Sequence, residues 1–418
     1  MAKTVPLDLR TLDWSHRIFQ RYYAEATVDP PTRLTRREFA AFPFAEQTLM
    51  RRHASFRTPE EFHDYLVREA PRHVYYSSAY YRVPDHANMA GKEWLGADLI
   101  FDLDADHLRG AQVLDYAQQL ALVKDRTRDL VDDFLIGDFG IPPESIDLIF
   151  SGGRGYHVHV RDAAFLPLSS PERRELVDYI QGVGFEPSDA VLETRESEGP
   201  PAAGGEDAGD RAPRRAHRSY KRLFPPDTPG WRGRATRSLL RTLARWDEVG
   251  KEAAVHEMER LGLPPPEARR LGRALVAEGR GRQIRETLSL EVFRRAVPEE
   301  FLGTVLRAAT IEVQGETDAP VTTDIHRLIR LSGSLHGGTG FRVTPVGRGG
   351  LDSFDPWQDA LIPAPKAERR TVELVEKIAY PFDHGGVDAA VGARVELPTP
   401  VALFRVLRGE ARLPPVPG

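Results

Sequence analysis

The sequence predicts a mixed α/β protein of the α+β class, with a mixed sheet that is flanked by helices and interrupted by a helical subdomain. In the first 190 residues, short runs rich in aromatic and β-branched side chains alternate with helical patterns. An Arg-, Ala- and Leu-rich stretch over 236–308 reads as several helices, and a β-rich segment resumes around 341–343. We therefore expect a first α/β part over 1–190, a flexible insertion with a helical subdomain over 191–300, and a second α/β part over 301–418.

Strands are predicted from side-chain content and helices from the spacing of apolar residues. The stretch 110–134 is expected to be a helix, because Tyr116 and Leu120 belong to a set of apolar residues that recur at helical spacing. Residues 200–218 are of low complexity and predict the flexible insertion. The helical stretch after it is interrupted at Leu261–Pro266, where three prolines follow one another. The expected strands are 74–81, 97–104, 146–150 and 156–160, with a further one near 389–397.

The composition excludes several classes of protein. The chain has no cysteine, so no disulfide can form and no zinc site is expected from cysteine. Its N-terminus has no apolar signal core. The sequence also contains no run of about 18 apolar residues that would predict a membrane span. We expect a cytoplasmic protein that does not use a membrane. Because the net charge is −5, any polyanion must be bound by local clusters of basic residues.

The segment 98–106 predicts a metal-binding strand. On a strand, Asp102 and Asp104 share one face, while the apolar residues between and before them point to the other. Two carboxylates placed in this way repel each other, and a divalent cation relieves that repulsion. Oxygen ligands suit Mg²⁺ and Mn²⁺. A bare Asp-x-Asp also fits a solvated edge strand, but the apolar remainder of this strand favours the metal site.

A glycine-rich turn over 151–155 joins two of the predicted strands. Glycines allow positive φ and leave backbone N–H groups accessible, so this turn would bind phosphate oxygens together with Ser151 and Arg154. His157 and His159 follow on one face of the next strand, where a His-x-His pair would also suit zinc or iron. A hairpin whose glycines serve only its shape is the simplest alternative.

A third group of residues lies near the C-terminal end. The stretch 321–331 is expected to be a short helix with Arg327 and Arg330 close together on its surface. A glycine-rich loop over 332–340 surrounds His336, which suggests close approach of the backbone to a ligand. An ordinary connection from helix to strand with exposed arginines fits the same residues.

Taken together, these segments resemble the three motifs of the archaeal-eukaryotic DNA primase small subunit, in its archaeal branch. The matching runs are Gly96–Asp104, Ser151–His157, and Asp324–Arg330 followed by Ser334–Gly337. The resemblance implies a primase-type catalytic domain. It also implies a nucleotidyltransferase that makes short RNA primers on single-stranded DNA, directed by the template, through two-metal nucleotidyl transfer.

The resemblance further implies roles for individual residues. Asp102, Asp104 and Asp318 would be catalytic and would bind two Mg²⁺ or Mn²⁺ ions. Asp318 is preferred to Asp324 because the third carboxylate of the family lies well upstream of its Ser-Leu-His element. Lys92 is a weaker candidate for a phosphate contact. The residues implied to bind the nucleotide are Arg52, Ser151, Arg154, His157, Arg330 and His336.

Partners and departures follow from the same resemblance. The family implies a single-stranded DNA template, nucleoside triphosphates and a large subunit that completes a heterodimer. Many members carry a Cys/His zinc site between the first two motifs, which a chain without cysteine cannot build in that form. Ser332 stands where the family usually has proline, and Gly338 stands where a lysine is common. None of these differences removes a catalytic carboxylate.

Three other functions remain open on the sequence. A repair or gap-filling polymerase of the same superfamily would extend existing primers without starting new ones. A glycosyltransferase also uses Asp-x-Asp with a cation, but it would depend on a sugar nucleotide and ignore DNA. A non-catalytic nucleic-acid-binding module would not bind metal, and the sequence shows no basic groove interleaved with aromatic residues.

Overall fold

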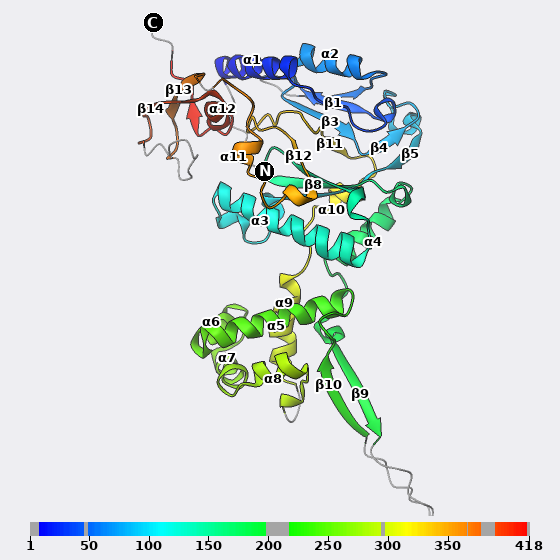
Figure 1. The fold of residues 1–418 in the computed structure, drawn as a ribbon, viewed down its shortest axis with the longest axis vertical. Coiled ribbons are helices and arrows are strands. Elements are labelled where there is room, and N and C mark those ends of the chain that lie inside the picture. Colours follow the sequence, from blue (N-terminus) through cyan, green and yellow to red (C-terminus); the bar gives the residue numbers. More distant parts are fainter. Residues whose placement is uncertain are drawn as a thin grey trace, which may run out of the picture. The chain divides into compact units, whose positions relative to one another are not determined.

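The fold is known from a computed structural model that describes residues 8–45, 49–197, 217–293, 297–365, 367–377 and 389–415 (Figure 1). The chain divides into two compact units. The first combines Met1–Tyr179 with Glu316–Gly418, and the second is Ile180–Gly315. Each unit is described by itself. In the described residues, no helix is long and apolar enough to cross a membrane.

The first unit contains a four-stranded antiparallel sheet, here called the first sheet, in the order β11-β3-β1-β2. Helices α1 (Leu9–Glu25) and α2 (Pro59–Glu69) cover one of its faces (Figure 1). That face is apolar because alternate residues of the strands, such as Phe39, Val74 and Tyr76, point into the core. The strands are β1 (Phe39–Phe42), β2 (Arg51–Ala54), β3 (His73–Ser77) and β11 (Leu328–Arg330).

A second four-stranded sheet in the same unit, here called the second sheet, has the order β12-β7-β8-β6 and is also antiparallel. Helix α3 (Tyr116–Asp129) packs against β8 and β6. The apolar residues of these strands, such as Phe101 and Val158, are fully buried. The alternate residues point to the opposite face, as the predicted alternation requires. The strands are β6 (Leu99–Asp104), β7 (Ile146–Phe150), β8 (Gly155–Val160) and β12 (Thr344–Val346).

Smaller elements complete the first unit. The predicted strand over 74–81 is divided at Ser78 into β3 and β4, and the one over 97–104 is preceded by β5, which pairs with β4. The tail forms a three-stranded sheet that includes the strand expected near 389–397. The remaining elements are β4 (Ala79–Tyr81), β5 (Trp94–Ala97), α4 (Ser170–Ile180), α10 (Ala319–Thr323), α11 (Pro356–Asp359), β13 (Arg369–Leu374), β14 (Arg394–Pro398), α12 (Thr399–Leu407) and β15 (Ala411–Arg412).

The second unit is a helical bundle with one pair of antiparallel strands, β9 and β10. The helices confirm the predicted helical stretch, and the break predicted at Leu261–Pro266 begins directly after α6 and includes the first two residues of α7. Their shared core is built around Trp246. The sequence did not predict the ladder of β9 with β10, and most of the expected flexible insertion over 200–218 lies outside the described residues. The elements are β9 (Val191–Ser197), β10 (His217–Leu223), α5 (Trp231–Val249), α6 (Lys251–Arg260), α7 (Pro265–Gly272), α8 (Arg280–Thr287) and α9 (Arg307–Glu312).

The helix predicted over 321–331 is wrong after Thr323. Helix α10 ends there, and β11 is a strand that pairs with β3. Between the two elements, the carboxylate of Asp324 accepts a hydrogen bond from the backbone N–H of His326 at 2.9 Å. Such a local bond competes with helical hydrogen bonding, and strand pairing to a distant segment then decides the structure.

Candidate active site

Strand β6 places two carboxylates on the face of the second sheet opposite α3. Asp102 lies across from His157 of β8, and Asp104 lies across from the glycine that begins β8. The third carboxylate belongs to Asp318, which directly precedes α10 and is distant in sequence from β6. The backbone N–H of Asp318 donates to the backbone carbonyl of Asp102 at 2.9 Å, and the Thr317 hydroxyl donates to the same carbonyl at 3.3 Å. The structure therefore brings together the three predicted metal ligands.

The charges of these carboxylates act on Asp102. Burial raises the pKa of Asp102, the nearby charges of Asp104 and Asp318 raise it in the same direction, and the pKa reaches about 7. Arg327 and Arg330 lower this pKa but do not offset the burial. The protein thus holds a carboxylate site that disfavours its own negative charge, as expected for a site completed by a cation.

The donor atoms of this cluster fit a hard divalent cation. All three side chains offer oxygen, which suits Mg²⁺ or Mn²⁺ better than a softer metal. In the described part of the chain, no three His, Asp or Glu side chains already converge closely enough to enclose an ion. Mg²⁺ usually takes only one or two carboxylates and fills its other positions with waters and substrate phosphates. The residues are therefore suited to an ion that is shared with a phosphate ligand.

Cation binding should depend on pH because it displaces a proton from Asp102. With its pKa near 7, we expect the affinity for Mn²⁺ to rise about tenfold for each pH unit below 7 and to level off above it. Taken alone, Asp102 keeps a proton in the folded, metal-free protein between about pH 4 and 7 that it loses in the unfolded chain, so its own contribution to stability falls as pH rises through that window. Calorimetric Mn²⁺ titrations at pH 5.5, 6.5 and 7.5 would measure the first effect. An affinity that did not change with pH would contradict the assignment.

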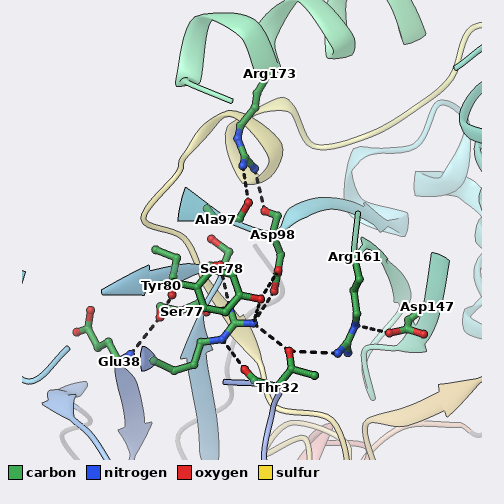
Figure 2. A network of polar contacts seen from close by, with 12 residues as sticks. Thr32, Glu38, Ser77, Ser78, Tyr80, Ala97, Asp98, Asp147, Arg161 and Arg173 are labelled. Atoms are coloured by element: carbon green, nitrogen blue, oxygen red, sulfur yellow. Dashed lines mark hydrogen bonds and ion pairs between the residues drawn. The ribbon is translucent and has the colours of Figure 1, made fainter. Parts of the chain in front are cut away.

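A buried ion pair fixes the strand that carries the two aspartates. Arg37 donates from Nη2 to a carboxylate oxygen of Asp98 at 2.6 Å. The Tyr80 hydroxyl donates to the other oxygen of Asp98 at 2.6 Å (Figure 2). Arg37 also donates to the backbone carbonyls of Ser77 and Ser78, each at 2.8 Å. Asp98 is the residue directly before β6, so the network ties the start of this strand to the end of β3.

A second arginine binds the backbone at the same point. Arg173 of α4 is almost fully buried and donates to the backbone carbonyls of Asp98 and Ala97, each at 2.8 Å (Figure 2). These two carbonyl groups lie at the junction of β5 and β6. Strand pairing does not supply a donor for them there, so another group must donate the hydrogen bonds. Arg37 and Arg173 together therefore hold the start of β6. Arg37 binds the side chain of Asp98, and Arg173 binds the backbone.

The glycine-rich turn lies against the third motif. Gly152 has a φ of +75°, and a Cβ atom added to it would come within 2.7 Å of the Cβ of His336. The turn is held from two sides, because Tyr116 donates to the carbonyl of Gly153 at 2.6 Å and Thr339 donates to that of Gly152 at 2.5 Å. Glycine is required here both for conformation and for close packing.

The predicted phosphate-binding residues of this turn differ in their surroundings. The hydroxyl of Ser151 accepts a hydrogen bond from the backbone N–H of Gly153 at 3.3 Å and is buried. Arg154 forms an ion pair with Asp106 and lies 3.8 Å from a carboxylate oxygen of Asp104. His157 Nε2 lies 3.6 Å from Asp102, and burial lowers the pKa of this histidine to about 3, so it is neutral.

A cavity of about 460 Å³ opens beside Asp104 and is lined by residues of both sheets. Among the described residues, the charged side chains that line it are one carboxylate, that of Asp104, and four guanidinium groups. Burial lowers the pKa of His336 well below its usual value, so that histidine contributes no charge. The cavity therefore favours a polyanion held beside the carboxylate cluster. The guanidinium groups belong to Arg72, Arg154, Arg330 and Arg408.

Comparison with known proteins decides the family. A sequence model of the family described as "DNA primase small subunit" matches residues 101–348. A protein named DNA primase small subunit PriS from Methanocella arvoryzae is 38% identical over 95% of this chain and 97% of its own length. Proteins of the same name from Methanothrix thermoacetophila and Haloarcula marismortui are 37% and 34% identical, over 97% of this chain in each case. This chain belongs to the DNA primase small subunit family.

Of the nucleotide-binding residues implied by this primase family, Arg154, Arg330 and His336 line the cavity, whereas Arg52, Ser151 and His157 are not among its described lining residues. Arg52 sits on the edge strand β2. Its guanidinium donates to both carboxylate oxygens of Glu38, at 3.0 and 3.2 Å. Glu38 and Lys92 are fully buried, with Lys92 Nζ 3.5 Å from the same carboxylate. Arg52 is therefore positioned by an internal ion network, which a sequence motif does not reveal.

The alternative third carboxylate is in a different place. Asp324 bonds to the backbone of its own turn and influences the pKa of Tyr81, whereas Asp318 acts on Asp102. The assignment of Asp318 as the third carboxylate stays a prediction.

Several residues of the cavity were missed by the sequence analysis. Phe42, His73 and Tyr75 line it from the first sheet, on the face opposite α1 and α2. The alternation of side chains along β3 places His73 and Tyr75 on the same face, so the strand pattern could have found them. Arg72 and Arg408 have no comparable signal, because each reaches the cavity from outside the three motifs of the primase small subunit.

Proposed function

We propose that this protein is the catalytic small subunit of a DNA primase, which synthesises short RNA primers on single-stranded DNA by two-metal nucleotidyl transfer. One observation carries the proposal: a cluster of three aspartates stands directly beside a cavity lined by four guanidinium groups. A nucleoside triphosphate combines the polyanion and the metal-binding phosphates that such a pair of sites would recognise.

Different residues would bind the metal ions, bind the triphosphate and orient its oxygens. Asp102, Asp104 and Asp318 would hold two Mg²⁺ or Mn²⁺ ions, which when bound lower the pKa of an attacking hydroxyl and stabilise the leaving pyrophosphate. Arg154 and Arg330 would bind the triphosphate and neutralise the charge that develops on it. The backbone N–H groups of the glycine-rich turn, together with Ser151, His157 and His336, would orient its oxygens. Arg52 would contact phosphate from the edge of the first sheet.

The partners follow from the same proposal. Single-stranded DNA would be the template and nucleoside triphosphates the substrates. A primase large subunit would complete a heterodimer, as the family's designation of a small subunit implies. We also propose that the protein acts in the cytoplasm, where a chain without cysteine needs no oxidising compartment.

The choice between a primase and a repair polymerase can be tested by comparing templates. Purified protein would receive labelled nucleotides and Mg²⁺ or Mn²⁺ with either unprimed single-stranded DNA or the same DNA carrying an annealed primer. We expect new short products on the unprimed template, with and without added large subunit. Extension restricted to the primed template under both conditions would instead establish a gap-filling polymerase of the same superfamily. Dependence on a sugar nucleotide without DNA would exclude both.

A further inference from the structure

The ring of His73 has a fixed arrangement of hydrogen bonds. Its Nδ1 lies 2.5 Å from Nη1 of Arg330 and accepts the backbone N–H of Gly337 at 3.3 Å. A guanidinium group and a backbone N–H can only donate, so Nδ1 must be the acceptor. The remaining nitrogen, Nε2, therefore carries the proton, and His73 offers an N–H donor. Burial lowers the pKa of this histidine well below its usual value, which agrees with a neutral ring.

His73 belongs to an aromatic cluster on one side of the cavity. Its ring centre lies 6.2 Å from that of Tyr75, and Phe42 lies 6.1 Å from each of them, so the three rings form one cluster. Arg330 covers the ring of Tyr75, with its guanidinium carbon 5.0 Å from the ring centre. The ring of His336 stands 5.3 Å from that of His73. The aromatic cluster is therefore adjacent to the groups that would bind phosphate.

We propose that the Nε2–H of His73 donates a hydrogen bond to a sugar hydroxyl of the incoming nucleotide, and that His73 and Tyr75 form the sugar-binding side of the cavity. This inference rests on the proposed function, because it requires the triphosphate to lie along the arginines. A nucleotide held in that way presents its sugar to this aromatic side. A neutral N–H donor suits a hydroxyl oxygen, since it adds no charge and its direction is fixed by Arg330 and Gly337.

The test uses two substitutions of His73 that distinguish the role of the acceptor Nδ1 from that of the donor Nε2. His73→Asn places a carbonyl oxygen near the position of Nδ1, so it retains an acceptor for Arg330 and loses the donor. His73→Gln places an amide N–H near the position of Nε2 and retains the donor. Equilibrium binding to wild type and both variants would be measured for a ribonucleoside triphosphate, its 2′-deoxy and 3′-deoxy analogues, and inorganic tripolyphosphate, with thermal unfolding as a check on folding.

We expect wild type to bind the ribonucleotide about tenfold more tightly than the analogue that lacks the contacted hydroxyl, which is the effect of one hydrogen bond. His73→Asn should reduce this ratio to about one and leave tripolyphosphate affinity unchanged, while His73→Gln should preserve most of the ratio. Equal binding of all three nucleotides by wild type, or an unchanged ratio in His73→Asn, would overturn the inference. The synthesis assay tests the proposed function separately: nucleotide binding with this ratio but without synthesis would count against the polymerase and leave the sugar contact standing.

Discussion

Replacing Asp102 or Asp318 with asparagine is expected to reduce nucleotide transfer by at least about 10³-fold. Each change removes a negative charge from the cluster while keeping the shape of the side chain. Without the carboxylate, the proposed metal ions, which would stabilise the transition state by several kcal/mol, would be held weakly. Incorporation of labelled nucleotides on single-stranded DNA would measure the loss, and Mn²⁺ titration of the same variants would show whether it follows metal affinity.

Asp324→Asn provides a matched control for Asp318→Asn. The two aspartates are neighbours in sequence, but only Asp318 is among the charges that act on Asp102. An asparagine at 324 can still accept the backbone hydrogen bond from His326, so we expect this variant to keep activity within about tenfold of wild type. If Asp324→Asn were as inactive as Asp102→Asn while Asp318→Asn remained active, the third carboxylate would have been misassigned.

Removing one partner of the buried Arg37–Asp98 pair is expected to have the largest effect on stability. Both side chains are almost fully buried, so Arg37→Met would leave the carboxylate of Asp98 without its counter-ion. The expected loss is about 3–5 kcal/mol in the free energy of unfolding. Urea denaturation followed by circular dichroism would measure it. The double variant Arg37→Met/Asp98→Leu should lose less than the sum of the two single changes, because neither charge then remains unpaired.

The neighbouring Arg36 supplies the control for this experiment. It is exposed, and among the described residues its side chain donates one hydrogen bond, to the backbone carbonyl of Arg82 at 3.3 Å. Arg36→Met should therefore change the free energy of unfolding by no more than about 0.5 kcal/mol. Equal effects of Arg36→Met and Arg37→Met would contradict the account of how β6 is held in place.

The parts of the fold that the sequence predicted are those encoded by local alternation. On β6, apolar and acidic residues alternate, so the shared face of Asp102 and Asp104 follows from the order of residues alone. The glycine-rich turn was equally visible, because its glycines leave few other conformations open. The resemblance to the primase family then indicated Asp318, which no local pattern connects with β6.

The features that escaped prediction depend on contacts between distant segments. Strand β11 was expected to be helical, because its apolar spacing does not reveal that β3 lies beside it. The partnership of Arg52 with Glu38 and the fixed ring of His73 likewise depend on side chains brought together by the sheet. Each of these interactions joins residues that only the folded chain places side by side, so a linear pattern carries little information about them.

Retention of a γ-phosphate label is the most direct test of the central claim, that this site starts nucleotide chains. The first nucleotide of a chain made without a primer keeps its triphosphate at the 5′ end, whereas every nucleotide added later loses its β- and γ-phosphates. Wild-type protein on unprimed single-stranded DNA should therefore yield short products that carry the γ label, and Asp102→Asn should yield none. Products labelled from the α-phosphate but never from the γ-phosphate, formed only when a primer is present, would contradict the account.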